Sequence, residues 1–232
     1  MVVYQLDHLT QPPTQEVMGP IQDDEALVLF ALIKCMRLRR VFEIGGLGGY
    51  SARNFLRAVG PQGTVYTVDL NPVPSQGPNH KCIQKNALDI TFEDLDNEPL
   101  DLVFFDCHDM VQMDVFARLK DKGLINDSTV LALHDTNLHY QQFCNWAPPC
   151  DDGWAHQPVE REMVNQFKEA WGYDVFCYHT EARHHDLSLP FRHGLTVCKK
   201  FFSLSPPQAR QRPRHGPGRS GSDGAWRAPA RR

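Results

Sequence analysis

The chain has 232 residues, of which 41% are hydrophobic and 22% charged, and its formal net charge is −4 with histidine neutral. A chain of this size and composition can bury a core without disulfide or metal staples, which excludes collagen-like, knottin-like and wholly disordered proteins. No stretch approaches the roughly 20 consecutive apolar residues that span a bilayer, and the first residues lack the pattern of a signal peptide. We therefore expect a cytoplasmic protein with no membrane partner.

Helices and strands are predicted to alternate along most of the chain. A helix is expected over 23–36, where acidic residues precede good helix formers. Short runs rich in β-branched and aromatic residues predict strands at 40–45, 63–69, 81–86, 100–106 and 128–135. Further helices are expected over 50–59 and 111–120. This alternation predicts an α/β fold with a Rossmann-like, doubly wound, mostly parallel sheet and helices on both of its faces.

The pattern loosens after His139. Residues 146–154 have the Pro, Asp and Gly content of a loop long enough to act as a lid or a substrate wall. A helix is predicted next, over 158–171, followed by strands at 173–178 and 195–201. The segment between these two strands is too short for a helical crossover, so we expect them to form an antiparallel hairpin at the sheet edge.

The last thirty residues differ in composition from the rest. Residues 203–232 contain seven arginines and one acid, Asp223, so they carry +6 and the first 202 residues carry −10. With so few apolar side chains, this segment cannot offset the entropy cost of ordering. We expect a folded domain over 1–202 and a disordered basic tail over 203–232. A solvated tail is favoured over an electrostatic arm for nucleic acid or an acidic partner.

Ligands of an open α/β sheet bind beyond the carboxyl ends of its strands, and here polar residues follow every predicted strand. Glycines between the first strand and its helix allow a ligand to approach the backbone, and the helix N-terminus offers N–H groups to an anion. Asp69, after the second strand, is suited to accept hydrogen bonds from two ribose hydroxyls. The sequence therefore predicts a nucleotide-like cofactor at this edge.

Two cofactor classes fit this pattern. Gly46-x-Gly48-x-x-Ser51 nearly matches the dinucleotide fingerprint, with Asp69 at about the expected distance of 20 residues, so an NAD(P)-dependent oxidoreductase is one alternative. However, Ser51 replaces the third glycine, and the acid Glu43 would face a pyrophosphate with a negative charge. S-adenosylmethionine has an amine, a carboxylate and a sulfonium but no phosphate, and we favour it.

These residues also carry a family resemblance. Glu43-x-Gly45-x-x-x-Gly49-Tyr-Ser51-Ala resembles the first motif of class I S-adenosylmethionine-dependent methyltransferases, particularly catechol O-methyltransferase and its relatives. Residues 68–72 resemble their second motif, with Asp69 in place of the usual glutamate, and the likeness extends over about 41–137. The resemblance implies that cofactor-binding residues are Glu43, Gly45, Gly46, Gly49, Ser51, Asp69, Asn86, Ala87 and Asp106. Within this set, Ser51 would bind the methionine carboxylate, Glu43 would lie near the amine, Asp69 would hold the ribose, and Asn86 with Ala87 would flank the adenine.

Acids and histidines follow the fourth and fifth predicted strands. Asp106, His134 and Asp135 offer oxygen and imidazole ligands suited to Mg²⁺, Mn²⁺ or Fe²⁺. The surrounding sequence resembles the metal site of the catechol-type enzymes and of the cephalosporin-hydroxylase and macrolide O-methyltransferase family. Two residues depart from that pattern: Asp109 stands where the catechol enzymes place a lysine base, and His134 stands where relatives often carry an acid. We expect a divalent metal held by Asp106, His134 and Asp135.

The reaction expected from this resemblance is O-methylation of a small molecule of the natural-product or secondary-metabolite type, assisted by the metal. Candidate proton acceptors are His108, His134 and His139, because histidines cluster after the fourth and fifth strands. A metal-independent N- or C-methyltransferase with a histidine base is a second alternative, and a nucleic-acid-modifying protein that uses the tail is a third. The expected partner is a small-molecule substrate rather than nucleic acid, and a homo-oligomer stays open.

Overall fold

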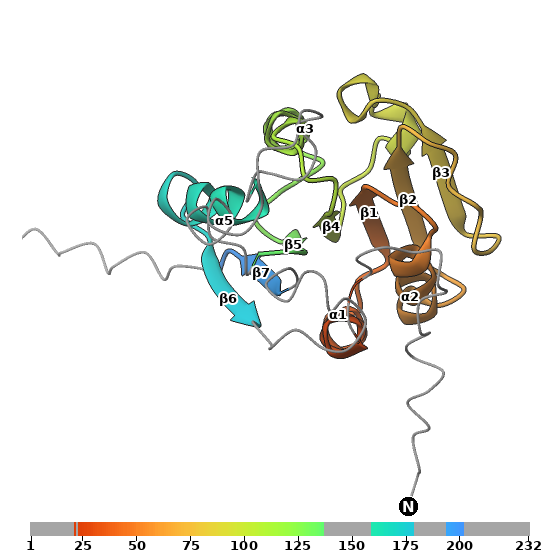
Figure 1. Ribbon diagram of the computed structural model, residues 1–232, viewed down its shortest axis with the longest axis horizontal. Helices are drawn as coiled ribbons and strands as arrows, with labels where there is room; N and C mark the ends of the chain where they lie inside the picture. Colours follow the sequence, from red (N-terminus) through yellow and green to blue (C-terminus); the bar gives the residue numbers. More distant parts are fainter. Residues whose placement is uncertain (1–20, 22, 137–158, 179–193, 202–232) are drawn as a thin grey trace, which may run out of the picture. The chain divides into compact units, whose positions relative to one another are not determined.

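The computed structural model describes residues 21, 23–136, 159–178 and 194–201 (Figure 1). Its strands are β1 (Arg40–Ile44), β2 (Thr64–Asp69), β3 (His80–Gln84), β4 (Leu102–Phe105), β5 (Val130–Leu133), β6 (Asp174–Tyr178) and β7 (Leu195–Lys199). Its helices are α1 (Asp23–Met36), α2 (Tyr50–Val59), α3 (Val111–Asp121) and α5 (Val159–Glu169), with short 3₁₀ turns η2 (Ala87–Asp89) and η3 (Glu93–Leu95). Every strand and helix expected in these ranges is present, which confirms the predicted alternation.

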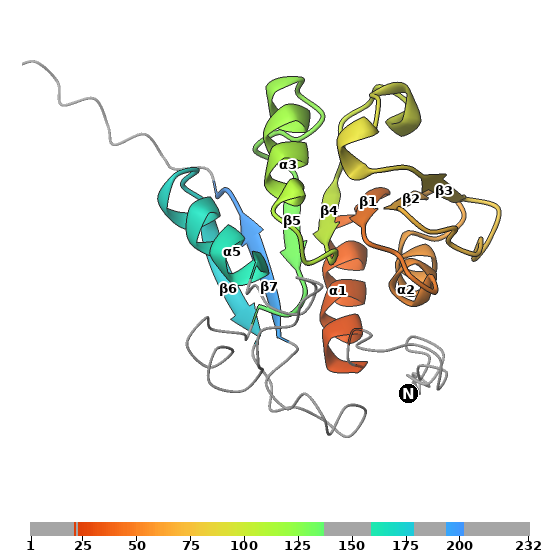
Figure 2. The same cartoon turned by 45° about the horizontal axis from the view of Figure 1, so that its top comes forward.

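The strands form a single sheet in the order β3-β2-β1-β4-β5-β7-β6 (Figure 2). From β3 to β5 neighbouring strands are parallel, whereas β7 is antiparallel to both β5 and β6. The predicted edge hairpin is therefore confirmed, with β6 outermost. The chain reverses its direction of travel across the sheet between β1 and β4, which is where ligands bind in open α/β sheets.

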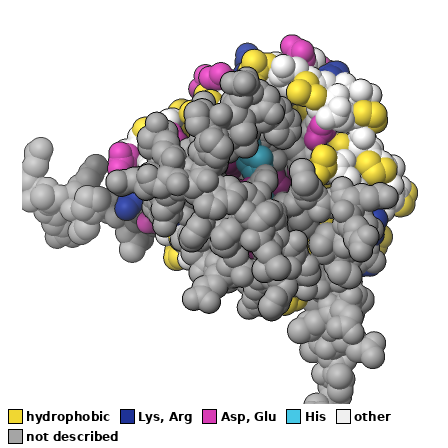
Figure 3. All heavy atoms as spheres, viewed as in Figure 1, with side chains coloured by type: hydrophobic (Ala, Val, Ile, Leu, Met, Phe, Trp, Pro, Cys, Tyr) yellow, Lys and Arg dark blue, Asp and Glu magenta, His cyan; other side chains and the backbone are white. Residues whose placement is uncertain are grey.

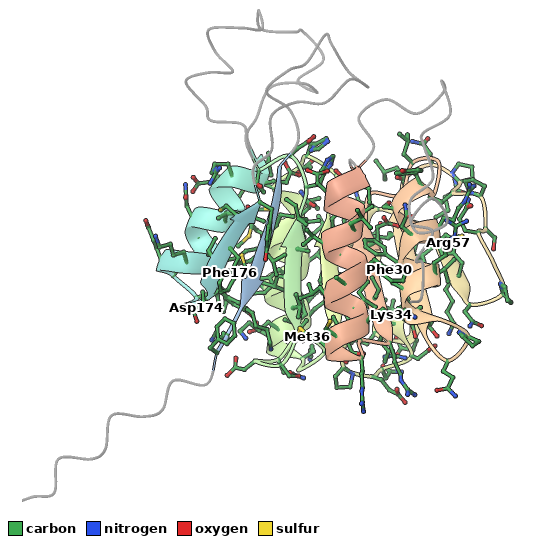
Figure 4. The ribbon with its side chains drawn as sticks, turned by 90° about the horizontal axis from the view of Figure 1, so that it is seen from below. Phe30, Lys34, Met36, Arg57, Asp174 and Phe176 are labelled. Atoms are coloured by element: carbon green, nitrogen blue, oxygen red, sulfur yellow. The ribbon has the colours of Figure 1, made fainter. Side chains whose placement is uncertain are left out.

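On the central strands, alternate residues enter two separate cores. On β4, Phe104 packs edge-on against Phe55 of α2, with ring centroids 5.1 Å apart, and its neighbour Phe105 packs against Phe167 of α5 at 5.8 Å. This follows from the two-residue period of a strand, which directs successive side chains to opposite faces. One core lies under α1 and α2, and the other lies under α3 and α5 (Figure 4). The predicted covering of both faces is confirmed.

The fifth strand ends earlier than its apolar run suggests. The sequence predicts a strand over 128–135, but β5 ends at Leu133. Asp135 has φ 55°, which takes the backbone out of the extended region at the edge of the sheet. Consequently His134 and Asp135 lie just beyond the strand, at the edge of the sheet.

Some expectations concern residues outside the described ranges. These include His139, the loop over 146–154 and the basic tail over 203–232, so the domain boundary at 202 remains a prediction. No helix within the described ranges is both long and apolar enough to cross a lipid bilayer.

Candidate cofactor and metal site

The glycine turn between β1 and α2 packs tightly against the neighbouring strands. Gly45 has φ +93°, and a Cβ atom there would lie 2.4 Å from the carbonyl oxygen of Asp106. A Cβ atom on Gly46 would lie 2.2 Å from Cγ2 of Thr67. Only glycine fits both positions without movement of the backbone or of a buried side chain. The turn therefore lies in close contact with the ends of β2 and β4.

Asp69, at the end of β2, holds the tip of this turn. Its Oδ2 accepts hydrogen bonds from the N–H groups of Gly46 at 2.9 Å and Leu47 at 3.0 Å, and its Oδ1 accepts one from Asn71 at 2.8 Å. The carboxylate expected to bind the ribose thus lies beside the glycines expected to lie under the methionine. The structure brings these two predicted parts of the cofactor site together.

Glu43 lies beneath the turn and is fully buried. The hydroxyl groups of Ser51 and Thr67 donate hydrogen bonds to its carboxylate, the second at 2.6 Å. Burial raises the pKa of Glu43 to about 8, although both hydrogen bonds oppose the shift. Ser51, assigned by resemblance to the methionine carboxylate, donates here to Glu43.

A chain of hydrogen bonds extends from Glu43 across the sheet. The Oγ1 atom of Thr67 lies 2.8 Å from Nε2 of His80, and Nδ1 of His80 accepts from the N–H of Gln76 at 3.1 Å. Because Nδ1 is an acceptor, Nε2 carries the hydrogen and donates to Thr67. The hydroxyl of Thr67 is then free to donate to Glu43, which fixes the direction of the chain.

Asn86 and Ala87 lie just after β3, in line with the other predicted cofactor residues. The side chain of Asn86 caps η2 by accepting from the N–H of Leu88 at 3.0 Å. Arg118 of α3 donates to the carbonyl oxygens of Ala87 and Ile90 at 3.3 Å and 3.0 Å. The turn expected to flank the adenine is therefore anchored to α3.

Asp106, His134 and Asp135 converge at the ends of β4 and β5. Each offers one ligand atom, and these atoms all lie within 4.8 Å of one another. Nδ1 of His134 is 3.1 Å from Oδ1 of Asp106, and its Nε2 is 3.4 Å from Oδ1 of Asp135. His134 and Asp135 are buried, whereas the side chain of Asp106 is 18% exposed. The three residues predicted to bind a metal thus form one cluster.

Three further residues complete this cluster. His108 follows β4, and its Nε2 lies 3.4 Å from Oδ2 of Asp135 and 3.8 Å from Oδ1 of Asp106. Glu25 of α1 lies 3.2 Å from Nε2 of His134, and Glu160 of α5 lies 3.2 Å from Nδ1 of His108. Figure 3 shows a histidine with acidic side chains beside it on this face of the molecule.

Sequence reasoning predicted His108 but missed both glutamates. A signal was present in each case, because each acid falls on the buried side of its helix. Glu25 precedes the buried Leu29 and Ile33 at intervals of four residues, and Glu160 precedes the buried Met163 and Phe167 at three and seven. Burying a carboxylate on the apolar face of a helix costs free energy unless the carboxylate has a polar or charged partner. A glutamate at such a position therefore indicates a polar site in the protein interior.

The acids and histidines of the cluster shift each other's pKa. Burial disfavours the charged form of His108, but the hydrogen bond and charge of Glu160, with Asp135 and Asp106, outweigh it and raise its pKa to about 9. Burial also opposes the charge on His134, yet the surrounding carboxylates raise its pKa well above 6.5. Burial raises the pKa of Asp106, with a smaller contribution from the charge of Asp135, although the two histidines oppose the shift.

Two residues of the cluster have a strained backbone conformation. His108 and Asp135 both have φ 55°, in the left-handed region that residues with a Cβ atom rarely adopt. Such strain persists where surrounding structure imposes it, often at functional sites. Asp109, by contrast, accepts a hydrogen bond from the N–H of Val111 at 2.9 Å, at the start of α3.

The chemistry of the cluster fits a bound cation. His134 has a carboxylate oxygen near each ring nitrogen, at 3.1 Å and 3.2 Å, and a neutral imidazole can donate to only one of them. The other nitrogen then presents a lone pair to an anionic oxygen, so a second proton or a metal ion must lie between them. Two ligands that bind one ion at right angles and at about 2.1 Å lie about 3.0 Å apart, close to the separation of His134 and Asp106.

Comparison of the sequence with known protein families and with curated protein sequences gives no match. The fold, however, is shared with solved proteins, several of which are described as O-methyltransferases. Cofactor-bound Rv0187 from MTB is 22% identical with a TM-score of 0.58, and the alignment covers 84% of this chain and 85% of that one. The O-methyltransferase from Bacillus cereus in complex with SAH is 16% identical, with a TM-score of 0.56 and coverage of 79% and 84%.

A third solved structure extends this likeness. The O-methyltransferase TomG from Streptomyces achromogenes, involved in tomaymycin synthesis and solved in complex with SAM, is 22% identical, with a TM-score of 0.54 and coverage of 78% and 81%. At these identities the likeness establishes the shared fold. The chain therefore has the Rossmann-like fold of the class I methyltransferases.

Proposed function

We propose that the protein is an S-adenosylmethionine-dependent methyltransferase that acts on an oxygen of a small molecule, assisted by a divalent metal. The observation that carries this proposal is the row of side chains along one edge of a methyltransferase-type sheet. Asp69 and the glycine turn lie at the ends of β2 and β1, and the cluster around Asp106 and Asp135 lies at the ends of β4 and β5. Solved proteins of this fold are described in complex with SAM and SAH.

The strand order argues against the NAD(P)-dependent alternative. Dinucleotide-binding sheets have the order 3-2-1-4-5-6 with parallel strands. Here β7 is inserted between β5 and β6 and is antiparallel to both. Glu43 also lies buried beneath the glycine turn, where a pyrophosphate would meet an acid rather than N–H groups alone.

Methyl transfer needs alignment and proton removal rather than a covalent enzyme intermediate. The acceptor oxygen forms a bond to the methyl carbon as the carbon–sulfur bond breaks, the sulfonium becomes a thioether, and the acceptor's proton must leave. Of the two candidate proton acceptors within the described residues, His108 is the one accessible to solvent. Its side chain is 20% exposed, whereas that of His134 is fully buried. We assign His108 to that proton when its ring is neutral and to a hydrogen bond with the acceptor oxygen when the ring is protonated, and Glu160 to holding the ring.

The metal would be held by Asp106, His134 and Asp135. When bound, a divalent ion there would lower the pKa of an acceptor hydroxyl group and fix its position. Asp106 is placed to contact both cofactor and metal. Its backbone packs against Gly45, and its carboxylate faces His134.

The cofactor proposal is tested by calorimetric titration of the full chain with SAH, SAM, NAD and NADP. We expect SAM and SAH to bind and the nicotinamide cofactors not to bind. Binding of NAD or NADP without SAH would select the oxidoreductase instead. An Asp69→Asn variant should weaken SAH binding about tenfold through the ribose, whereas Asp121→Asn, at the exposed end of α3, serves as a matched surface control.

The reaction is tested by transfer of a labelled methyl group from SAM to a panel of phenolic and other hydroxylated small molecules. We expect transfer to oxygen, a loss of rate in a chelator, and recovery on addition of Mg²⁺, Mn²⁺ or Fe²⁺. Full activity in the chelator would refute metal assistance and support the metal-independent alternative. Transfer to nitrogen or carbon alone would refute O-methylation.

A further inference from the structure

A buried glutamate lies behind one ring nitrogen of His134. Oε2 of Glu25 is 3.2 Å from Nε2 of His134, and Oε1 of the same carboxylate accepts the N–H of Gly194 at 2.7 Å. Glu25 is 1% exposed and comes from α1, on one face of the sheet. It therefore ties α1 to the end of β5 and the start of β7.

His108 is held in the same manner from the opposite face. Oε1 of Glu160, on α5, is 3.2 Å from Nδ1 of His108 and accepts the backbone N–H of His108 at 2.9 Å. The side chain of Gln112 on α3 donates to the same oxygen at 2.9 Å. Glu160 is also 1% exposed, so water cannot readily replace these partners.

Each buried glutamate lies against one ring nitrogen of its histidine and favours a proton there. An ionised carboxylate only accepts, so Glu25 favours the hydrogen on Nε2 of His134 and Glu160 favours it on Nδ1 of His108. The opposite nitrogens, Nδ1 of His134 and Nε2 of His108, are the ones that a metal ion can bind once they have lost their protons. Carboxylates that hold histidine in this way are the usual partners of metal-binding imidazoles.

Both remaining nitrogens face the same two aspartates. Nδ1 of His134 is 3.1 Å from Oδ1 of Asp106. Nε2 of His108 is 3.4 Å from Oδ2 of Asp135 and 3.8 Å from Oδ1 of Asp106. A ring nitrogen this close to a carboxylate oxygen has either a proton or a metal ion between them, and a metal ion that binds here takes the place of the proton.

We propose that His108 joins Asp106, His134 and Asp135 as a fourth ligand, a role that replaces its assignment as proton acceptor, and that Glu25 and Glu160 are the positioning residues that turn the two histidines toward the ion. The inference rests on the metal-assisted form of the proposed function and deepens it. Two imidazoles with two carboxylates favour a transition metal such as Mn²⁺ or Fe²⁺ over Mg²⁺, which prefers oxygen ligands.

The first test is calorimetric titration of the full chain with Mn²⁺ and with Mg²⁺. We expect Mn²⁺ to bind at least tenfold more tightly than Mg²⁺. Glu25→Gln and Glu160→Gln should each weaken Mn²⁺ binding about 10- to 100-fold. The matched control is Glu98→Gln, at an exposed glutamate paired with Arg40, which should leave binding unchanged. Circular dichroism and thermal unfolding of each variant show whether it has folded.

The second test needs no variant. Pulsed electron paramagnetic resonance of Mn²⁺ bound to the wild-type chain with ¹⁵N-labelled histidine should detect two directly bound imidazole nitrogens. His108→Gln should reduce this number to one and bring the affinities for Mn²⁺ and Mg²⁺ closer together. His80→Gln, at a buried histidine on β3, should leave both signals in place.

The outcomes separate this inference from the function on which it rests. A single coupled nitrogen in the wild type, or unchanged Mn²⁺ binding in folded Glu25→Gln and Glu160→Gln, would overturn the inference and leave the metal proposal standing. Failure of the wild type to bind Mn²⁺ while it binds SAH would overturn both the inference and the metal, but not the methyltransferase. Failure to bind SAH would count against the proposed function itself.

Discussion

At the scale of single residues, the site depends on positions where little else than the observed side chain fits. Gly45 combines a positive φ with close packing, since a Cβ atom added there would lie 2.4 Å from a backbone oxygen, which cannot rotate away. Glu43 combines full burial with two hydroxyl donors. Both residues precede α2, the helix whose N-terminus the cofactor is expected to face. Their effect on stability can be measured without an activity assay.

Replacing Gly45 with alanine should destabilise the protein by about 3 kcal/mol or more, because left-handed strain adds to the clash with Asp106. Gly123→Ala is the matched control: Gly123 has φ +78°, but no heavy atom lies within 4 Å of its Cβ position. That change should cost about 1 kcal/mol, from strain alone. Urea unfolding of both variants measures the difference, and equal losses would contradict the close packing of the turn.

The raised pKa of Glu43 predicts how stability depends on pH. Between its ordinary value of 4.5 and its value of about 8 in the fold, the folded state keeps a proton that the unfolded chain has released. The free energy of unfolding should therefore fall as pH rises through this range, by up to about 1.4 kcal/mol per pH unit from this group. Stability from Glu43 is fully present below pH 4.5 and lost above about 8.

The measurement is urea unfolding without cofactor at several pH values from about 5 to 8. Glu43→Gln should show a weaker fall in stability than the wild type, because glutamine does not titrate. The histidines of the cluster also titrate in this range, and the comparison of the two proteins cancels their contribution. Parallel curves for wild type and variant would contradict a raised pKa at Glu43.

At the scale of elements, single strands and helices carry side chains that act only in combination. Glu43 on β1, Thr67 on β2 and His80 on β3 form one hydrogen-bond chain across three neighbouring strands. Their register follows from the parallel pairing, in which Glu43 lies opposite Thr67. The chain thus links the end of the glycine turn to the edge of the sheet.

Thr67→Val removes the middle of this chain while keeping its volume. We expect a loss of about 2 kcal/mol in stability, because Glu43 and His80 each lose a buried partner. Thr64→Val, at the partly exposed start of the same strand, should change stability by no more than about 0.5 kcal/mol. Chemical unfolding compares the two variants, and similar values would show that the hydrogen-bond chain contributes little.

At the scale of the whole molecule, charge is divided unequally along the chain. The first 202 residues carry −10, and they include all the acids of the proposed site, while residues 203–232 carry +6. A negative field around the site attracts metal ions and a sulfonium cofactor. The basic tail has no assigned part in this chemistry.

Deletion of residues from Ser203 onward should leave SAH affinity and methyl transfer to a small molecule within about twofold of the full chain. The reason is that every residue proposed to bind cofactor or metal precedes position 203. Calorimetry and the labelled-methyl assay make the comparison at equal salt concentration. Loss of activity on deletion would instead support a tail that recruits nucleic acid or an acidic partner.

Much of the fold could be predicted from local patterns. Apolar runs of four to six residues, separated by glycine turns, indicated the strands, and apolar residues at helical spacing indicated the helices. These signals are local, because hydrophobic period and turn chemistry are properties of short segments. The same patterns placed Asp69, Asp106 and Asp135 at strand ends. The sequence predicted that the last two strands form a hairpin. It did not predict that β7 lies between β5 and β6, since sheet order is not a local property.

The sequence by itself thus determined the elements, the glycine turn, the residues at the strand ends and the uneven charge. Only the tertiary structure decided which of those residues meet. Glu25 and His134 are more than a hundred residues apart in the chain, as are Glu25 and Gly194, yet packing of α1 on the sheet brings them into contact. The physical reason is that a strand end specifies the direction of its own side chains, whereas a helix contributes to a site only once its apolar face has packed.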